Sequence, residues 1–150
     1  DNAPGQVVIS GHRAAVERAI KLAGERGGRR AIMLDVSAPF HCALLKPAAE
    51  AMREALDKVP PAEPHVPLVS NVTALSVSDP DEIRRLLVEQ VKAMVLWRES
   101  VLHMKSLGIG LLIEVGGGKV LTGLTRRIDP DMKAMSVESP ADIDALLKLL

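Results

Sequence analysis

The residues with the clearest chemical potential lie together in the stretch VSAPFHCALLKPA, residues 36–48. This stretch places His41 after a Ser-Ala-Pro-Phe turn and just before a predicted helix. An imidazole can take up and return a proton near neutral pH, which suits a general base. Catalytic groups of open α/β sheets gather beyond the carboxyl ends of strands, and a strand is predicted directly before this turn. By pattern alone, His41 is either a catalytic base or a structural histidine with one hydrogen-bond partner.

The neighbouring Cys42 raises the question of a Cys–His pair. Adjacent residues at the start of a helix point in different directions, so a direct thiol–imidazole hydrogen bond is not expected. A small buried thiol is the preferred interpretation. Because Cys42 is the only cysteine of the sequence, an internal disulfide is excluded and a reducing cytoplasm is favoured.

A glycine cluster, Gly116-Gly117-Gly118-Lys119, suggests a phosphate-binding loop. A Walker loop would need glycine in place of Ile113 and Ser or Thr in place of Val120, and a dinucleotide fingerprint would need glycine in place of Leu121. Both motifs therefore fail. The glycines predict a tight turn from a strand into a helix, with a helix N-terminus that could accept an anion as the alternative.

The remaining chemical candidates are a serine and three histidines. Ser106 resembles the end of a G-x-S-x-G nucleophile elbow, but Met104 replaces the first glycine and the stretch lies at a predicted helix end. His12, His65 and His103 have no Cys, His or carboxylate neighbours at metal-ligand spacing. We expect neither a nucleophile nor a metal site among these residues.

Composition limits the classes of function. The sequence is 47% apolar but has one Phe, one Trp and no Tyr, which predicts an aliphatic core in a single domain. Its 19 basic and 19 acidic residues, with so few aromatics, argue against nucleic-acid binding. No apolar run reaches membrane-spanning length and no signal-peptide pattern opens the sequence. The sequence begins with Asp1 rather than Met, which suggests further residues upstream.

The elements that must position these residues alternate between strands and helices. Strands are predicted at residues 6–10, 31–36, 68–72, 111–115 and 133–137. Helices are predicted around residues 16–23, at 47–59, from Asp79-Pro80 to about 91, around 97–104, up to 128 and after 140. The continuous apolar run at 111–115 is typical of a strand buried on both faces of a parallel sheet. This alternation predicts an α/β fold with parallel pairing.

Several segments together resemble one family, the malonyl-CoA:acyl carrier protein transacylases and the related acyltransferase domains of fatty acid and polyketide synthases. The matching segments are residues 2–12, 36–49, 67–72, Gln90 with Trp97, and 114–128. Each segment is weakly specific by itself, but they follow the family's order and spacing along nearly the whole sequence. The sequence departs from the family at Gly117, where members usually have proline, and in the absence of any G-x-S-x-G.

The resemblance implies a hydrolase-like parallel-sheet core with an inserted ferredoxin-like subdomain. Residues 1–35 would be the second half of that subdomain, and residues 36–150 the C-terminal part of the core. The family's nucleophilic serine, its oxyanion-hole donors and its carboxylate-binding arginine belong to an N-terminal half, which is expected as a partner. Without that half, the chain is expected to be inactive.

The resemblance also implies a reaction and roles for four residues. The reaction is malonyl transfer from malonyl-CoA to the phosphopantetheine thiol of acyl carrier protein through a serine acyl-enzyme, in cytoplasmic fatty acid biosynthesis and without a cofactor. His41 would be the base, held by the main-chain carbonyl of Gln90. Asn2 would lie near the acyl pocket. Phe40 resembles the malonyl-selecting pattern, because a bulky ring leaves no room for an α-methyl branch.

Two alternatives stay open. One is an acyltransferase domain of a polyketide synthase; the other, of a different class, is a non-catalytic module that binds acyl carrier protein. An acidic carrier protein would meet a basic surface, for which Arg29-Arg30, Lys119 and Arg126-Arg127 are candidates. Basic residues near a helix end are more often partners of the helix dipole.

Overall fold

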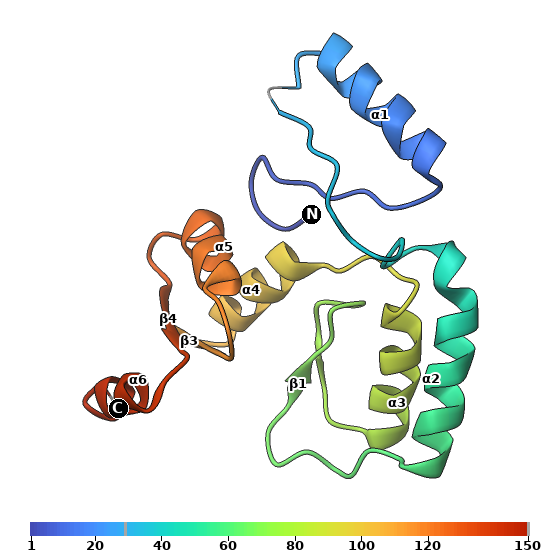
Figure 1. Cartoon of the computed structure of the whole chain (residues 1–150). Coiled ribbons are helices and arrows are strands. Elements are labelled where there is room, and N and C mark those ends of the chain that lie inside the picture. Colours follow the sequence, from blue (N-terminus) through green and yellow to red (C-terminus); the bar gives the residue numbers. More distant parts are fainter. Residues whose placement is uncertain (29, 150) are drawn as a thin grey trace. The chain divides into compact units, whose positions relative to one another are not determined.

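The computed structural model describes residues 1–28 and 30–149 of the chain, which form α-helices and short strands; helices and strands alternate strictly only from α4 to α6 (Figure 1). The helices are α1 (Arg13–Glu25), α2 (Lys46–Lys58), α3 (Pro80–Gln90), α4 (Trp97–Ser106), α5 (Val120–Ile128) and α6 (Pro140–Leu147), with a 3₁₀ turn at Ala43–Leu45. The strands are β1 (Leu68–Val69), β2 (Ser76–Val77), β3 (Leu111–Val115) and β4 (Lys133–Val137). The chain forms two compact units. The histidine unit comprises Val8–Val72 and Ser76–Val95, and the sheet unit comprises Asp1–Val7, Thr73–Leu75 and the residues from Leu96 onward.

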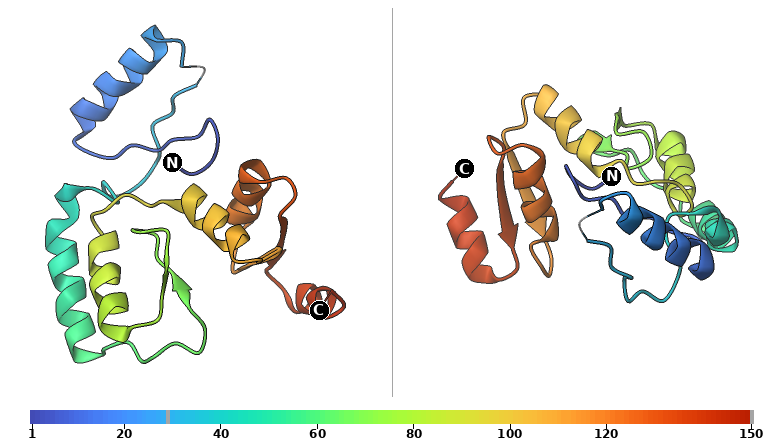
Figure 2. Two further views of the ribbon diagram at one scale, coloured as in Figure 1. Left: turned by 180° about the vertical axis from the view of Figure 1, so that it is seen from behind. Right: turned by 90° about the horizontal axis from the view of Figure 1, so that it is seen from above.

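The sheet unit is built on a parallel strand pair. β3 and β4 pair in register from Leu111 opposite Lys133 to Val115 opposite Val137. The helix α5 connects the two strands and contacts both, as the orange-to-red segment of Figures 1 and 2 shows. The predicted parallel α/β arrangement is therefore confirmed. The prediction that β3 is buried on both faces is wrong, because the face that carries Ile113 and Val115 is exposed: Val115 is 80% exposed. β4 is the one strand neighbour of β3 among the described residues.

The histidine unit contains two packed helices and a short antiparallel strand pair. The helices α2 and α3 contact each other, and Ala49, Ile83 and Leu86 are buried. The predicted start of α3 is confirmed: the Asp79 side chain accepts a hydrogen bond from the Glu82 N–H at 2.8 Å, and Pro80 occupies the first helical turn. The strand predicted at residues 68–72 is confined to Leu68–Val69.

Two predicted strands are absent from the structure. Residues 6–10 and 31–36 have no strand; Gln6 forms an isolated bridge to Ala3 only. Their apolar side chains are exposed: Val7, Val8, Ile9, Ile32, Met33, Leu34 and Val36. An apolar pattern gives a segment its strand propensity, but a strand also needs a neighbour for its N–H and C=O groups. No described segment supplies that neighbour.

No helix of the described residues is long and apolar enough to cross a membrane. The boundary predicted between residues 35 and 36, and the ferredoxin-like character of the segment before it, stay predictions.

Candidate functional site

The backbone of His41 has an unusual conformation. Its φ angle is +58°, in the left-handed region, between the Pro39 turn and the 3₁₀ turn that precedes α2. A residue with a Cβ pays about 1–2 kcal/mol for this conformation, although histidine adopts it more readily than most residues. Such strain persists where the surrounding structure enforces it, and it gathers at functional sites. The strain is therefore a structural reason to treat His41 as more than a surface histidine.

The ring of His41 is fixed by the main chain of another element. Its Nδ1 lies 2.9 Å from the carbonyl oxygen of Gln90. A carbonyl oxygen can only accept a hydrogen bond, so Nδ1 carries the proton and donates it. In the neutral ring, the lone pair then lies on Nε2, which is the atom left to take up a proton. This is the contact that the resemblance implied, while its role in catalysis stays a prediction.

Gln90 offers its carbonyl because of its place in the helix. It is the last residue of α3, and the last four carbonyls of a helix have no intrahelical partner. The N–H groups of Lys92 and Ala93 bond instead to the Glu89 carbonyl, at 3.1 and 3.0 Å. The C-terminal end of a helix carries a partial negative charge, which favours a nearby cation. The end of α3 can therefore stabilise the imidazolium that forms when His41 accepts a proton.

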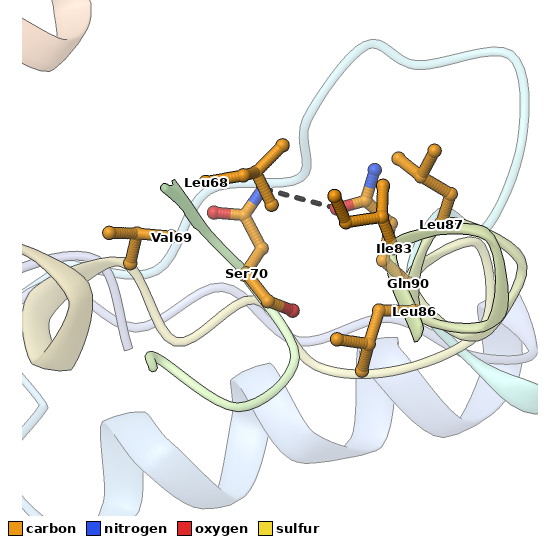
Figure 3. A pocket seen from close by; sticks show the side chains of 8 residues that line it. Leu68, Val69, Ser70, Ile83, Leu86, Leu87 and Gln90 are labelled. Atoms are coloured by element: carbon orange, nitrogen blue, oxygen red, sulfur yellow. Dashed lines mark hydrogen bonds between the residues drawn. The ribbon is translucent and has the colours of Figure 1, made fainter. Parts of the chain in front are cut away.

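The side chain of Gln90 makes a second contact. Its Oε1 accepts a hydrogen bond from Asn71 Nδ2 at 3.2 Å, the dashed line in Figure 3. The two residues line a pocket with Leu68, Val69, Ser70, Ile83, Leu86 and Leu87. Sequence reasoning missed Asn71, although it belongs to the Pro-Leu-Val-Ser-Asn-Val segment that supported the resemblance.

The neighbours of His41 in the turn have different surroundings. Phe40 is 46% exposed, and its N–H donates to the Ala38 carbonyl at 3.0 Å. The Cys42 thiol donates to the Pro39 carbonyl at 3.2 Å, so its hydrogen bond is within the turn rather than to the imidazole. Cys42 is half-buried rather than buried as predicted, because the start of its helix lies at the surface.

Asn2 belongs to the sheet unit, whereas His41, Phe40 and Gln90 belong to the histidine unit. Its N–H donates to the Gln6 carbonyl at 3.1 Å, in a turn that Gly5 makes possible with a φ of +73°. The guanidinium of Arg127 donates to the Pro4 carbonyl at 2.9 Å and to the Gln6 side-chain oxygen. Arg127 therefore anchors the turn that carries Asn2.

The helix that follows the glycine cluster binds a carboxylate at its first turn. Glu114 accepts hydrogen bonds from the N–H groups of Thr122 and Leu121, at 2.7 and 3.0 Å. These N–H groups, Thr122 first, lower the pKa of Glu114 below its usual value. The first turn of α5 is therefore occupied by the chain's own carboxylate, which argues against the alternative that this helix N-terminus receives an external anion. A Glu at the end of a strand, directly before the glycines, is the sequence signal that could have revealed this contact.

The other candidates are engaged elsewhere. Ser106 Oγ donates to the His103 carbonyl at 2.7 Å, at the end of α4. Within the described ranges, no group of three His, Cys, Asp or Glu side chains could hold a metal ion. Lys119 Nζ lies 3.8 Å from Glu138, and Arg126 donates weakly to the Ala134 carbonyl at 3.4 Å. Arg29 lies outside the described residues.

Comparison with known proteins gives a consistent result. No family model matches the chain. A malonyl CoA-acyl carrier protein transacylase of Haemophilus influenzae is 46% identical over 149 residues, which cover 99% of this chain and 48% of that protein. An acyl carrier protein S-malonyltransferase structure from Vibrio cholerae has a TM-score of 0.92 and 44% identity, over 97% of this chain and 48% of that chain. A malonyl-transacylase solved in complex with a type II PKS acyl-carrier protein has a TM-score of 0.94 and 41% identity, over 99% of this chain and 48% of that chain.

The chain spans about half the length of the curated relatives it matches. The structural likeness extends to the mixed α/β fold with its parallel strand pair. In sequence and in fold, the chain therefore matches the C-terminal half of malonyl CoA-acyl carrier protein transacylases along almost its whole length.

Proposed function

We propose that this chain is the C-terminal part of an acyltransferase that moves a malonyl group from malonyl-CoA to the phosphopantetheine thiol of acyl carrier protein. The observation that carries the proposal is the His41 imidazole, in a strained turn and with Nδ1 bound to the Gln90 carbonyl. This geometry leaves Nε2 as a proton acceptor, and the match of almost this whole chain to about half of the named transacylases supports the reaction.

In the first half of the proposed reaction, a serine from the remainder of the enzyme attacks the thioester carbonyl of malonyl-CoA. His41 Nε2 takes the hydroxyl proton as the oxygen–carbon bond forms. The tetrahedral intermediate then collapses, the carbon–sulfur bond breaks, and the coenzyme A thiol leaves with the proton that Nε2 returns. A malonyl ester on the serine remains.

In the second half, the phosphopantetheine thiol gives its proton to Nε2 and its sulfur attacks the malonyl ester. The serine oxygen leaves and recovers the proton from the imidazolium, which completes a ping-pong cycle. The Gln90 carbonyl fixes the tautomer in both halves without placing a full charge beside the ring. A thioester is reactive enough that a neutral partner can replace the usual carboxylate.

Other parts of the proposal rest on the resemblance. Asn2 would contact the acyl group, Phe40 would favour malonyl over branched groups, and no cofactor would be needed. Residues 1–35 would form half of a ferredoxin-like subdomain. The enzyme would act in the cytoplasm, in fatty acid biosynthesis.

An N-terminal half is the proposed partner of this chain. Apolar side chains such as Val8, Ile32 and Leu34 are exposed on the unpaired segments, and Val115 is exposed on β3. Exposed apolar surface of this kind is suited to burial against further polypeptide. Its position on or near potential strands suggests that additional strands would pair there.

Acyl carrier protein is the proposed acceptor, supported by the transacylase solved with a type II PKS acyl-carrier protein. That same relative favours a second candidate, malonyl loading of a polyketide carrier protein. Assays with carrier proteins of both kinds would separate the two roles by their kcat/KM ratio.

The test uses the complete polypeptide that contains this segment. Incubation with labelled malonyl-CoA should give one covalent malonyl group per chain, and addition of carrier protein should remove it. A polypeptide that binds carrier protein but never acquires malonyl would contradict the proposal and favour a binding module.

A further inference from the structure

We propose that Asn71 is a positioning residue for His41, because its side-chain amide holds the residue whose carbonyl holds the imidazole. The inference rests on the proposed role of His41 as the base. It adds a residue to the site that neither pattern nor resemblance indicated.

Two hydrogen bonds meet at Gln90. Asn71 Nδ2 donates to the Gln90 side-chain Oε1 at 3.2 Å, and the Gln90 main-chain oxygen accepts from His41 Nδ1 at 2.9 Å. All three residues belong to the histidine unit. Gln90 therefore links Asn71 to His41: its side chain bonds to Asn71, and its main-chain oxygen bonds to His41.

The carbonyl of Gln90 needs a contact from outside α3 to fix its direction, because Gln90 is the last residue of the helix. Terminal helical residues fray, and the direction of a terminal carbonyl follows the conformation of the last turn. Asn71 lies two residues beyond β1, next to the buried Ser70, whose Oγ accepts from the Val72 N–H at 3.2 Å. A fixed segment thus holds the end of α3 at the residue that contacts the imidazole.

The surroundings make this hydrogen bond matter. The Asn71–Gln90 pair is half-buried, in a pocket whose walls carry Leu68, Ile83, Leu86 and Leu87 (Figure 3). Among such apolar neighbours, an amide without its hydrogen-bond partner destabilises the folded state, because its partial desolvation is no longer offset. Gln90 would then turn its side chain towards water, which would disturb the last turn of α3 and the carbonyl.

The first experiment measures malonyl transfer by the complete enzyme carrying Asn71→Leu, Gln90→Met or both. Each single change removes the hydrogen bond at similar volume and should lower kcat/KM about three- to tenfold, the value of one hydrogen bond. The kcat/KM of the double variant should be no lower than that of the less active single variant, because both changes remove the same interaction. The control Leu68→Ala trims the same pocket without touching the hydrogen bond and should stay within about twofold.

The second experiment reads the ring directly, by ¹⁵N NMR of the His41 imidazole in the same proteins. In spectra of the neutral ring, the wild type should carry its proton on Nδ1. Asn71→Leu and Gln90→Met should each increase the tautomer with the proton on Nε2, and Leu68→Ala should not. A merely structural role for Asn71 would lower stability without this change.

The outcomes separate the two proposals. Unchanged His41 ring signals in both hydrogen-bond variants, or strictly additive losses in the double variant, would overturn the positioning role. Full transfer by a His41→Ala enzyme would instead remove His41 from the proposed mechanism, and a complete enzyme that never acquires malonyl would overturn the proposed function. In both cases the ring signals would still decide whether Asn71 orients the imidazole. Gln90→Met removes the acceptor of the same hydrogen bond, so the test can still be made if an Asn71 variant fails to fold.

Discussion

His41 is constrained from two directions, by a left-handed backbone in its own turn and by the end of α3 against its ring. Neither constraint needs a charged neighbour. The first fixes where the side chain leaves the chain, and the second fixes which ring nitrogen carries the proton. Together they give an imidazole whose Nε2 has one defined role available, that of proton acceptor.

The first prediction is that His41→Ala in the complete enzyme lowers malonyl transfer about 10²–10⁴-fold, the usual contribution of a positioned base. Steady-state transfer to carrier protein is the measurement. His65→Ala, at an exposed histidine of the same unit, is the matched control and should keep full activity. Near-wild-type turnover of the His41 variant would remove it from the mechanism.

The second prediction is that Gln90→Ala does much less harm than His41→Ala. Alanine keeps the main-chain carbonyl, so the contact with Nδ1 can still form. The loss should resemble that of Asn71→Leu, about three- to tenfold, because both variants lack the same side-chain hydrogen bond. Parallel kinetics of the three variants give the comparison. A Gln90 variant as inactive as the histidine variant would mean that its side chain has a larger role.

The sequence predicted these residues unequally. His41 is conspicuous because its turn and its side-chain chemistry are local, although pattern alone left a structural role open. Gln90 contributes its main-chain carbonyl, a group that every residue has, so its residue type gives no signal of this role. Only the resemblance indicated it. Asn71 acts through a partner 19 positions away, a separation that cannot be read without a structure.

At the scale of elements, the capped helix start and the β3–α5–β4 unit were predicted correctly, whereas two strands predicted from their apolar pattern alone were not. Asp79 and Pro80 start α3 where expected, because a cap and a fixed φ act within one turn. The β3–α5–β4 unit also formed as expected. The strands at residues 6–10 and 31–36 did not form, because an apolar pattern does not provide the neighbour that a strand requires.

The third prediction concerns Glu114, which joins the end of β3 to the start of α5. Glu114→Gln should lower the Tm of the complete protein at pH 7, because an amide accepts the N–H groups of Thr122 and Leu121 less strongly than a carboxylate. The folded-state pKa of Glu114 is lowered, so its stabilisation is present above the unfolded value of 4.5 and is lost as the pH falls through the lower folded value.

Thermal unfolding of both proteins between pH 7 and pH 3 tests this prediction. The Tm difference should be constant at neutral pH and shrink below about pH 4.5 as the wild-type carboxylate becomes protonated. Glu63→Gln, at an exposed position in the loop before β1, should leave the Tm unchanged. A Tm difference that is undiminished at pH 3 would mean that the charge of Glu114 is not the source of its contribution.

At the scale of the whole molecule, the aliphatic composition predicted a core, but the described chain leaves many of its apolar side chains exposed. The expectation for β3 failed for this reason, because the face that carries Ile113 and Val115 is left exposed. An apolar pattern predicts that a segment is buried. It does not show whether the helices and strands that would bury it belong to these 150 residues. The match covers about half the length of the transacylase, and the other half is the proposed source of the polypeptide that buries these side chains.

The last prediction is that residues 1–150, expressed alone, neither form a malonyl-enzyme nor transfer malonyl. The sequence has no G-x-S-x-G, Ser106 donates to a helical carbonyl, and the Cys42 thiol donates within its turn. Without a nucleophile, His41 has no proton to take. Without oxyanion donors, the developing charge is unstabilised, a loss of about 10²–10³ per donor.

The measurement is mass spectrometry of the isolated chain after incubation with labelled malonyl-CoA, beside the complete polypeptide as the positive control. Circular dichroism must first show that the isolated chain is folded, because its exposed apolar segments favour aggregation. A folded chain that stays unlabelled supports the division of the site between two halves of the polypeptide. A stable monomer that acquires one malonyl group would contradict it, and Cys42→Ala and Ser106→Ala variants would then identify which side chain accepts the acyl group.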